Sequence, residues 1–374
     1  MQKYIRRLKV DWYICIPAII LAALALFTLA SFGEVQVRFI KQAAWVAVGI
    51  VVFFLMHKLD PSYLRERKLT LVIYGLAVLS LLLLFLAGHV AKGAQSWIRL
   101  GFLSIQPTDP AKIALILLLA KYFSKRHMEI SAFRHVLVSG LYAGLLGGLV
   151  LLQPDFGSAV TVFTIWAGMI FASGISKKHI TLLVIAVLLT GVGAWNFAFK
   201  EYQKQRIMNF IHPLADIRGS GYNQYQAVIA VGSGQIWGKG IGYGTQSKLK
   251  FLPEYQTDFI FAAFAEEWGF AGVTLVLALC ATMLIRMLYI ARRVSTNFDV
   301  LFITGVVVFF GVHMCINIGM NLGVMPVTGI PLPFMSYGGS HVIIEFMALG
   351  IVSSMSAARR SVGRRKVYNE FVGF

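Results

Sequence analysis

Ionisable side chains are scarce in the apolar stretches of this sequence, so each of them is a candidate for chemistry. The candidates are Asp109, Lys112, Asp155, Asp258, Glu266, Glu267, His313 and Glu345. Asp109, Asp155 and Asp258 fall at the ends of apolar stretches, with Lys112 one helical turn inside, and the others lie deeper. The strongest candidates therefore converge on one half of the molecule, which the topology below places outside.

Asp258 is the strongest candidate for a general base. It follows the polar segment Glu254–Thr257 and directly precedes the apolar segment Phe259–Phe261. A carboxylate at the boundary between water and lipid, beside aromatic rings, is partly desolvated, as a base that works near neutral pH requires. The alternative is that Asp258 only caps the helix that follows, a role that Thr257 could fill equally well.

Asp109 and Lys112 open another apolar stretch, with Pro110 between them. This spacing is typical of an N-cap aspartate followed by proline at the first helical position, with Lys112 paired to Asp109. The alternative is that Lys112 holds an anionic group of a substrate. Asp155 lies in the tight turn Gln153–Ser158, where the sequence favours capping of the next helix.

The glycine-rich segment Gly232–Gly240 does not have the spacing of a nucleotide-binding loop, and no Ser or Thr follows Lys239. A turn that brings Lys239 to a phosphate remains an alternative. We expect Glu266 and Glu267 to tie helices together by hydrogen bonds. His313, Asn317 and Asn321 form a polar stripe of the kind that joins helices, and a lone His is weak support for a metal site.

Composition identifies the elements that must position these side chains. Of 374 residues, 58% are hydrophobic and only 13% are charged, and the mean hydropathy is +0.73. These values exclude a water-soluble globular protein and predict an all-α polytopic membrane protein with about ten spans in one domain, 1–374. The spans are expected at 12–30, 40–56, 69–88, 110–123, 135–152, 159–174, 180–198, 259–288, 300–321 and 341–357. The first span reads as an uncleaved signal anchor.

The distribution of charge predicts the topology. The net charge is +18. Of the 34 Lys and Arg residues, 22 fall in the segments on one side of the expected spans, and only four fall in the short loops on the other side. The positive-inside rule therefore places both termini in the cytoplasm and argues against nucleic acid binding. The long loop 199–258 is then extracytoplasmic and is expected to be ordered against the membrane. The uncharged loop 321–340, stiffened by prolines, is expected to line a cavity.

The segment Thr245–Phe261 closely resembles the signature of the SEDS family of bacterial cell-wall proteins. Three further segments agree with it, and the ten-span pattern matches along nearly the whole chain. These segments are Lys92–Trp97, Ile229–Gly234 and Pro326–Pro333 with Ser336–Ser340. The proline at 331 resembles the elongation, or RodA, branch.

The resemblance implies a peptidoglycan glycosyltransferase that polymerises lipid II at the outer face of the bacterial inner membrane, for cell elongation and rod shape. Asp258 matches the family's essential aspartate. The substrate-binding residues expected with it are Lys112, Asp109, Asp155, Lys239, Gln246, Ser247, Glu254 and Thr257. The chain departs from the family pattern at Asp109-Pro110, at Ser96 and at His341.

The implied reaction inverts the donor sugar to a β-1,4 linkage and releases undecaprenyl pyrophosphate. It needs one base at the acceptor hydroxyl and a cation near the diphosphate, which Lys112, Lys239 or a bound Mg2+ could supply. The expected partners are a class B penicillin-binding protein and other membrane proteins of the elongation complex. The competing hypothesis is a flippase for the lipid-linked precursor, which would need polar residues on both faces of the membrane.

Overall fold

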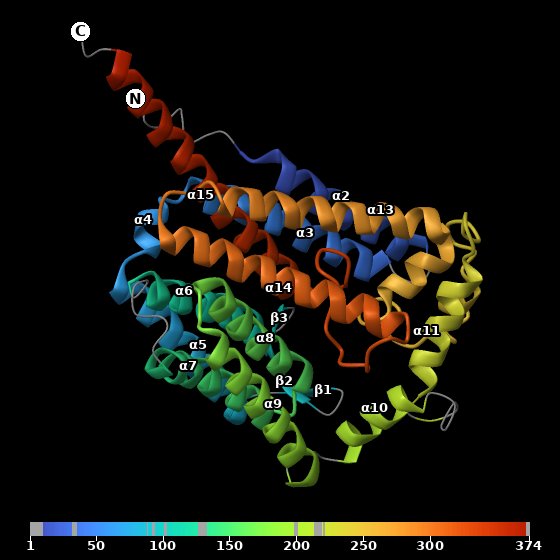
Figure 1. The fold of residues 1–374 in the computed structure, drawn as a ribbon. Coiled ribbons are helices and arrows are strands. Elements are labelled where there is room, and N and C mark those ends of the chain that lie inside the picture. The colour runs from blue at the N-terminus through green and yellow to red at the C-terminus, as the bar shows by residue number, and fades with distance from the viewer. Residues whose placement is uncertain are drawn as a thin grey trace.

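The computed structural model describes residues 10–31, 36–87, 89–91, 94–100, 103–125, 133–197, 201–212, 219 and 221–371. Within these ranges the chain is almost entirely helical (Figure 1). The helices are α2 (Trp12–Ser31), α3 (Gln36–Lys58), α4 (Pro61–Leu64), α5 (Arg67–Ala87), α6 (Thr108–Ser124), α7 (Phe133–Leu152), α8 (Phe156–Ser173), α9 (Lys177–Phe197), α10 (Glu201–Ile211), α11 (Tyr222–Ser233), α12 (Thr245–Lys248), α13 (Ile260–Ala291), α14 (Asn297–Asn321) and α15 (Gly339–Phe371).

Eight helices of the described chain are long and apolar enough to cross a membrane, namely α2, α3, α5, α7, α8, α13, α14 and α15. The expected multi-pass helical architecture is therefore confirmed. Two further predicted spans, 110–123 and 180–198, coincide with α6, which has 17 residues, and with α9. The total of ten spans and the side on which the termini lie stay predictions.

Helix α6 lies in the interior of the bundle, where α5, α7, α8 and α14 surround it. Its residues 111–120 are all buried. A helix that is apolar all round belongs in such a position, because no face of it is suited to water. A side chain at the start of α6 is therefore held inside the protein and away from the lipid.

A small antiparallel sheet connects α5 to α6. Its strands are β1 (His89–Ala91), β2 (Ala94–Leu100) and β3 (Leu103–Ile105), in that spatial order. This sheet was not expected from the sequence. Pairing between the strands satisfies backbone N–H and C=O groups in this non-helical segment, which would be costly to leave without partners near lipid. Lys92 and Gly93, and the side chain of Ser96, lie outside the described residues.

The two loops expected to be functional are both built into the fold. The described part of loop 199–258 contains α10, α11 and α12, and α11 packs against α13 and α14. Loop 321–340 buries the side chains of Ile330, Leu332 and Phe334 completely or nearly so. Figure 1 shows α10 and α11 at the end of the bundle opposite to the projecting end of α15. The described residues of both loops thus contact the helices of the bundle, or are buried among them.

The start of α2 and the later part of α15 meet at one end of the bundle. Asp11 accepts hydrogen bonds from Arg286 at 2.8 Å and from Ser356 at 3.2 Å. These contacts place the start of α2, the later part of α13 and this part of α15 side by side.

Candidate active site

Helix α13 is broken nine residues after its start. Gly269 has φ 64° and ψ −165°, which no helix contains. The segment 234–240 fills the break: the Phe270 N–H donates to the Gln235 carbonyl at 2.8 Å, and the Lys239 N–H donates to the Glu266 carbonyl at 3.0 Å. The backbone groups that the break releases are thus satisfied by a loop at membrane depth.

The glycines of this segment allow the two backbones to touch. A Cβ at Gly234 would lie 2.0 Å from the carbonyl oxygen of Ala265, and one at Gly238 would lie 2.1 Å from that of Glu267. No side chain fits at such distances, so both positions require glycine. The glycine spacing of the segment Gly232–Gly240 therefore serves packing against α13.

Glu266 anchors the next part of the long loop. Its buried carboxylate accepts hydrogen bonds from Lys239 Nζ at 2.8 Å, Thr245 Oγ1 at 3.0 Å, the Gln246 N–H at 3.0 Å and Ser247 Oγ at 3.3 Å. Three residues predicted to bind substrate, Lys239, Gln246 and Ser247, are thereby directed to Glu266. This supports the expectation that Glu266 ties elements together.

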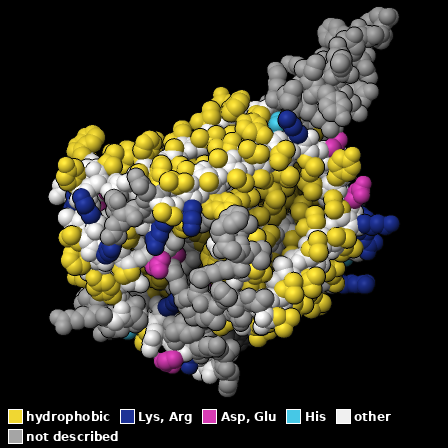
Figure 2. Space-filling view, turned by 180° about the vertical axis from the view of Figure 1, so that it is seen from behind, with side chains coloured by type: hydrophobic (Ala, Val, Ile, Leu, Met, Phe, Trp, Pro, Cys, Tyr) yellow, Lys and Arg dark blue, Asp and Glu magenta, His cyan; other side chains and the backbone are white. Residues whose placement is uncertain are grey.

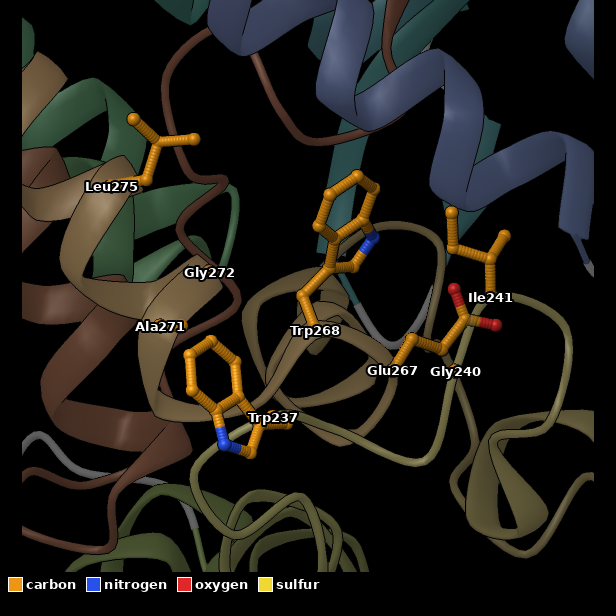
Figure 3. Close-up of a pocket in the computed structure, with 8 residues that line it drawn as sticks. All are labelled: Trp237, Gly240, Ile241, Glu267, Trp268, Ala271, Gly272 and Leu275. Carbon is orange, nitrogen blue, oxygen red and sulfur yellow. The ribbon is translucent and has the colours of Figure 1, made fainter.

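Glu267 holds the same junction from its other side. It accepts hydrogen bonds from Ser31 Oγ at 2.7 Å and from the Gly242 N–H at 3.0 Å. Beside it lies a pocket of about 370 Å³, into whose rim Trp237 and Trp268 project (Figure 3). Among the described residues, the lining of this pocket includes no Lys, Arg or His that could pair with a diphosphate.

Asp258 lies at the opposite end of the first part of α13, about 12 Å from Glu266 along the helix axis. Its carbonyl accepts hydrogen bonds from Asn317 Nδ2 at 3.0 Å and Asn321 Nδ2 at 3.1 Å. Asn321 Oδ1 in turn accepts the Ala262 N–H at 3.0 Å. The polar stripe of α14 therefore satisfies the start of α13, and the capping role considered for Asp258 falls to Asn321.

The carboxylate of Asp258 is half-buried and faces the second loop. A Cβ added at Gly329 would lie 3.7 Å from its Oδ2. The same loop is fixed on both sides of this glycine, because Asn317 Nδ2 donates to the Ile330 carbonyl at 2.8 Å and Gly157 lies against the Thr328 carbonyl. The glycine leaves room beside the carboxylate where a side chain would otherwise stand.

Glu254 and Thr257 lie just before Asp258. Thr257 Oγ1 donates to Glu254 Oε2 at 3.0 Å, and the Thr257 carbonyl accepts a hydrogen bond from Ser336 Oγ at 2.7 Å. Glu254 is exposed and has φ 54°, which marks a tight turn. These two predicted site residues are thus brought next to the candidate base.

Asp155 caps α8, as the sequence favours. Its Oδ1 accepts the Ser158 N–H at 3.0 Å, and its Oδ2 accepts a hydrogen bond from Gln106 Nε2 at 3.3 Å. Since Gly157 packs on Thr328, Asp155 lies close to the same loop that Asp258 faces. The structure therefore groups both carboxylates around loop 326–333.

A buried cluster of five ionisable side chains lies beneath this loop. Lys112 Nζ lies 3.2 Å from Asp109 Oδ1 and 3.4 Å from His313 Nε2. His341 lies 3.3 Å from Asp109 Oδ2 through Nδ1 and 2.8 Å from Glu345 Oε1 through Nε2. Lys112 and Asp109 are each only 2% exposed. Buried charges persist only when they are paired, and here each carboxylate contacts at least one basic group.

Two details of the cluster differ from the sequence-based interpretation. Helix α6 begins at Thr108 after Pro107, so Asp109 lies inside the first turn and is not its N-cap. His341 was noted only as a departure from the family pattern, yet it bridges Asp109 and Glu345. The signal that could have found it is the spacing of His341 and Glu345, four residues apart on one apolar helix.

The buried cluster and Asp258 are joined through α14. His313 contacts Lys112 and also lies 3.3 Å from the Pro331 carbonyl through Nδ1. Asn317, one turn later, holds the Asp258 carbonyl. The rise between these two positions is about 6 Å. The fold thus places the candidate base and the buried lysine against successive turns of α14, which contribute Asn317 and His313.

Known proteins share this sequence and fold. The sequence profile of the FtsW/RodA/SpoVE family, described as a cell cycle protein, matches residues 7–361. The peptidoglycan glycosyltransferase MrdB of Escherichia coli (strain K12) is 35% identical over 324 residues, which cover 87% of each chain. Stage V sporulation protein E of Bacillus subtilis (strain 168) is 35% identical over 321 residues, covering 86% of this chain and 87% of the relative.

Two solved structures are also similar. One, described as "Structural coordination of polymerization and crosslinking by a peptidoglycan synthase complex", has a TM-score of 0.81 and 30% identity, and covers 94% of this chain and 99% of its own. The rod shape determining protein RodA of Thermus thermophilus has a TM-score of 0.71 and 29% identity, and covers 94% of this chain and 98% of its own. The chain therefore belongs to the FtsW/RodA/SpoVE (SEDS) family, in which its likeness to MrdB and RodA supports the RodA branch.

Proposed function

We propose that this chain is a peptidoglycan glycosyltransferase that polymerises lipid II into glycan strands during cell elongation. The observation that carries the proposal is the placement of Asp258. Its main chain is fixed by two asparagines of α14, while its carboxylate remains half-buried beside Gly329. A base fixed in this way is oriented before substrate arrives, as proton transfer at a defined position requires.

The chemistry proposed for Asp258 is a single displacement. The carboxylate accepts the proton of the acceptor sugar hydroxyl as that oxygen bonds to the anomeric carbon of the donor. The bond between that carbon and the diphosphate breaks, and undecaprenyl pyrophosphate leaves with the electron pair. One displacement converts the α-linked donor into a β-1,4 linkage and needs one base on the acceptor side.

We propose that Lys112 stabilises the negative charge that develops on the leaving diphosphate. This role is supported by the α14 residues that they contact, His313 for Lys112 and Asn317 for Asp258, which are one turn apart. Lys112 is buried and paired with Asp109 in the conformation described. It therefore stabilises the diphosphate through its electrostatic field and not through a direct contact. Asp109 then stabilises the charged form of Lys112. Asp155 helps to position loop 326–333, which lies between α8 and Asp258.

Lys239, Gln246 and Ser247 receive a supporting role. Their contacts to Glu266 fix the loop that leads into Glu254 and Thr257, which lie next to Asp258. Among the described residues, no group of three or more His, Cys, Asp or Glu side chains is placed to hold a metal ion. Mg2+ is usually held by one or two carboxylates together with substrate phosphates. No step is assigned to such an ion, and assays with EDTA test whether the reaction requires it.

We further propose a class B penicillin-binding protein as partner in the inner membrane, within the elongation complex. The similar structure described as a peptidoglycan synthase complex supports such an assembly. The exposed side chains beside the α13 break, with Trp237 82% and Tyr243 73% exposed, are suited to docking at the outer face.

The test uses purified full-length protein with lipid II in detergent, and a gel that separates glycan strands. We expect glycan strands to form. The flippase alternative is tested in parallel, by incorporating the protein into vesicles that carry a fluorescent lipid II analogue and measuring its transfer between leaflets. Transfer without strand formation would overturn the proposal.

A further inference from the structure

A second cavity, of about 610 Å³, lies where the start of α5, the end of α6 and the start of α7 meet. We call it the basic pocket, because Arg67, Lys121, Lys125 and Arg134 line it. Tyr122 and His135 belong to its wall, and aliphatic side chains of the same three helices complete it. Figure 2 shows Lys and Arg side chains gathered at the right-hand edge of the molecule, the side on which α4 to α6 lie.

The positive charge of the basic pocket is not balanced by the described chain. Asp299 is engaged by Arg65 at 2.6 Å, and Glu66, beside Arg67 in the chain, is exposed to solvent. Lys121 Nζ donates to the carbonyl of Arg65, which is a neutral group. No ion pair joins any lining cation to a carboxylate of the described residues, and no acidic side chain lines the cavity among them.

The inner wall of the basic pocket is rigid and polar. His135 is buried, and its Nδ1 lies 3.0 Å from the Tyr122 hydroxyl. The Tyr122 ring packs edge-on against the Tyr142 ring, with centroids 6.1 Å apart, and the Tyr74 hydroxyl donates to the Tyr142 carbonyl at 2.8 Å. Hydrogen-bonding groups therefore face a space that is rimmed by cations.

The outer side of the basic pocket opens toward lipid. Leu71 of α5 lines it and is 43% exposed, and Val138 of α7 lines it from the other helix. A ligand with an anionic head and an apolar tail therefore finds cations and aliphatic surface side by side.

The basic pocket is separate from the candidate active site. Arg65 beside it pairs with Asp299 at the start of α14, whereas Asn321 at the end of α14 holds Asp258. The rise of α14 between these positions is about 33 Å. This distance matches the hydrocarbon thickness of a bilayer, so the two sites lie at opposite membrane surfaces. The charge pattern predicts that the basic pocket is at the cytoplasmic surface.

We propose that the basic pocket binds the phosphate headgroup of an anionic phospholipid, with the acyl chains lying along α5 and α7. Basic pockets between membrane helices at the cytoplasmic surface are suited to such headgroups. Arg forks and Lys ammonium groups donate to phosphate oxygens, and the Tyr122 hydroxyl adds a neutral partner. The bound headgroup neutralises the positive charge of the basic pocket where the three helices meet, so it stabilises this end of the bundle.

The test compares lipids that differ only in headgroup charge. Full-length protein in detergent is titrated with short-chain phosphatidylglycerol, with phosphatidylcholine of the same chain length, and with inorganic phosphate, while native mass spectrometry records bound ligand. We expect phosphatidylglycerol to bind at least tenfold more tightly than phosphatidylcholine. Inorganic phosphate that binds as tightly as phosphatidylglycerol would overturn the lipid assignment in favour of a phosphate site.

The variant Arg67→Gln/Lys125→Gln/Arg134→Gln removes three lining charges and leaves Lys121 in its backbone contact. Its matched control is Lys58→Gln/Lys178→Gln/Arg292→Gln, which removes three exposed charges from the same predicted surface outside the pocket. We expect at least a tenfold loss of phosphatidylglycerol affinity in the first and less than twofold in the second. Equal losses in both, or none in the first, would overturn the proposal.

A single variant keeps the proposal testable if the triple variant is not recovered as a monodisperse protein. Arg134→Gln changes an exposed side chain in the first turn of α7. We expect it to weaken phosphatidylglycerol binding about threefold, and unchanged binding would contradict the proposal.

Discussion

Replacement of His341 by alanine is expected to destabilise the protein through the buried cluster. The His341 side chain is 4% exposed and lies between Asp109 Oδ2 at 3.3 Å and Glu345 Oε1 at 2.8 Å. Without it, Asp109, 2% exposed, keeps only Lys112 as a basic partner, and Glu345, 0% exposed, loses its basic partner. Removing one partner of a buried pair costs about 3–5 kcal/mol, because the remaining charge loses its compensation.

The expected loss of stability is large enough to be measured as a change in the unfolding temperature. At about 2 °C per kcal/mol for a large chain, the loss corresponds to a fall of roughly 6–10 °C in the unfolding temperature. Intrinsic fluorescence of the protein in detergent measures this temperature during heating. A matched control is Ser340→Ala, the neighbouring residue, whose hydroxyl only accepts the Gln106 N–H at 3.3 Å. The control is expected to lose about 1 kcal/mol or less.

A double-mutant cycle separates the cluster from general damage to α15. If His341 acts by compensating Asp109, the variant Asp109→Asn/His341→Ala loses less stability than the two single variants together. The same cycle is measured for glycan polymerisation at limiting lipid II. Additive losses, or a His341→Ala protein that unfolds within 1 °C of the wild type, would refute the role given to this histidine.

Three further outcomes are expected. Lys112→Met should lower polymerisation more at limiting than at saturating lipid II, because it removes the charge placed near the diphosphate; a normal rate at limiting substrate would make the lysine purely structural. Gly238→Ala should cost more than about 2 kcal/mol and expose loop 234–244 to protease, since its Cβ would lie 2.1 Å from the Glu267 carbonyl oxygen; Gly232→Ala, which meets nothing within 4 Å, is the control. The cognate class B penicillin-binding protein should co-purify and raise the polymerisation rate even with its transpeptidase serine inactivated, as expected of a partner that orders the outer loops. Failure both to co-purify and to change the rate would contradict this.

The bundle was predictable because its signal is strong. Long apolar runs specify membrane helices, and the multi-pass fold follows from them. The helix ends were less certain: α6 begins two residues before the expected start at 110, and this shift moves Asp109 from the cap into the helix. Capping preferences alone do not settle such a shift, because Pro107 and Pro110 are both compatible with a first turn.

The sequence indicates which polar residues of the site join elements, but it does not indicate which residues they contact. The stripe on α14 was expected to join helices, yet nothing in the sequence indicates that Asn317 and Asn321 would hold the Asp258 carbonyl. The break at Gly269 was missed, because a single glycine in an apolar run does not reveal that a distant loop will supply the hydrogen bonds. His341 was missed as part of the cluster, since its partner Asp109 lies more than 200 residues away in the chain.

The most direct test of the central claim is the polymerisation rate of Asp258→Asn. The amide has nearly the same shape but cannot accept the proton of the acceptor hydroxyl. Asp60→Asn is the control, because Asp60 caps the short helix α4, close to Arg65 and far from Asp258. We expect the Asp258→Asn protein to fold, to bind lipid II and to lose about 10²–10⁴ in rate, while the control retains its rate. An Asp258→Asn protein that polymerises lipid II at most of the wild-type rate would contradict the account.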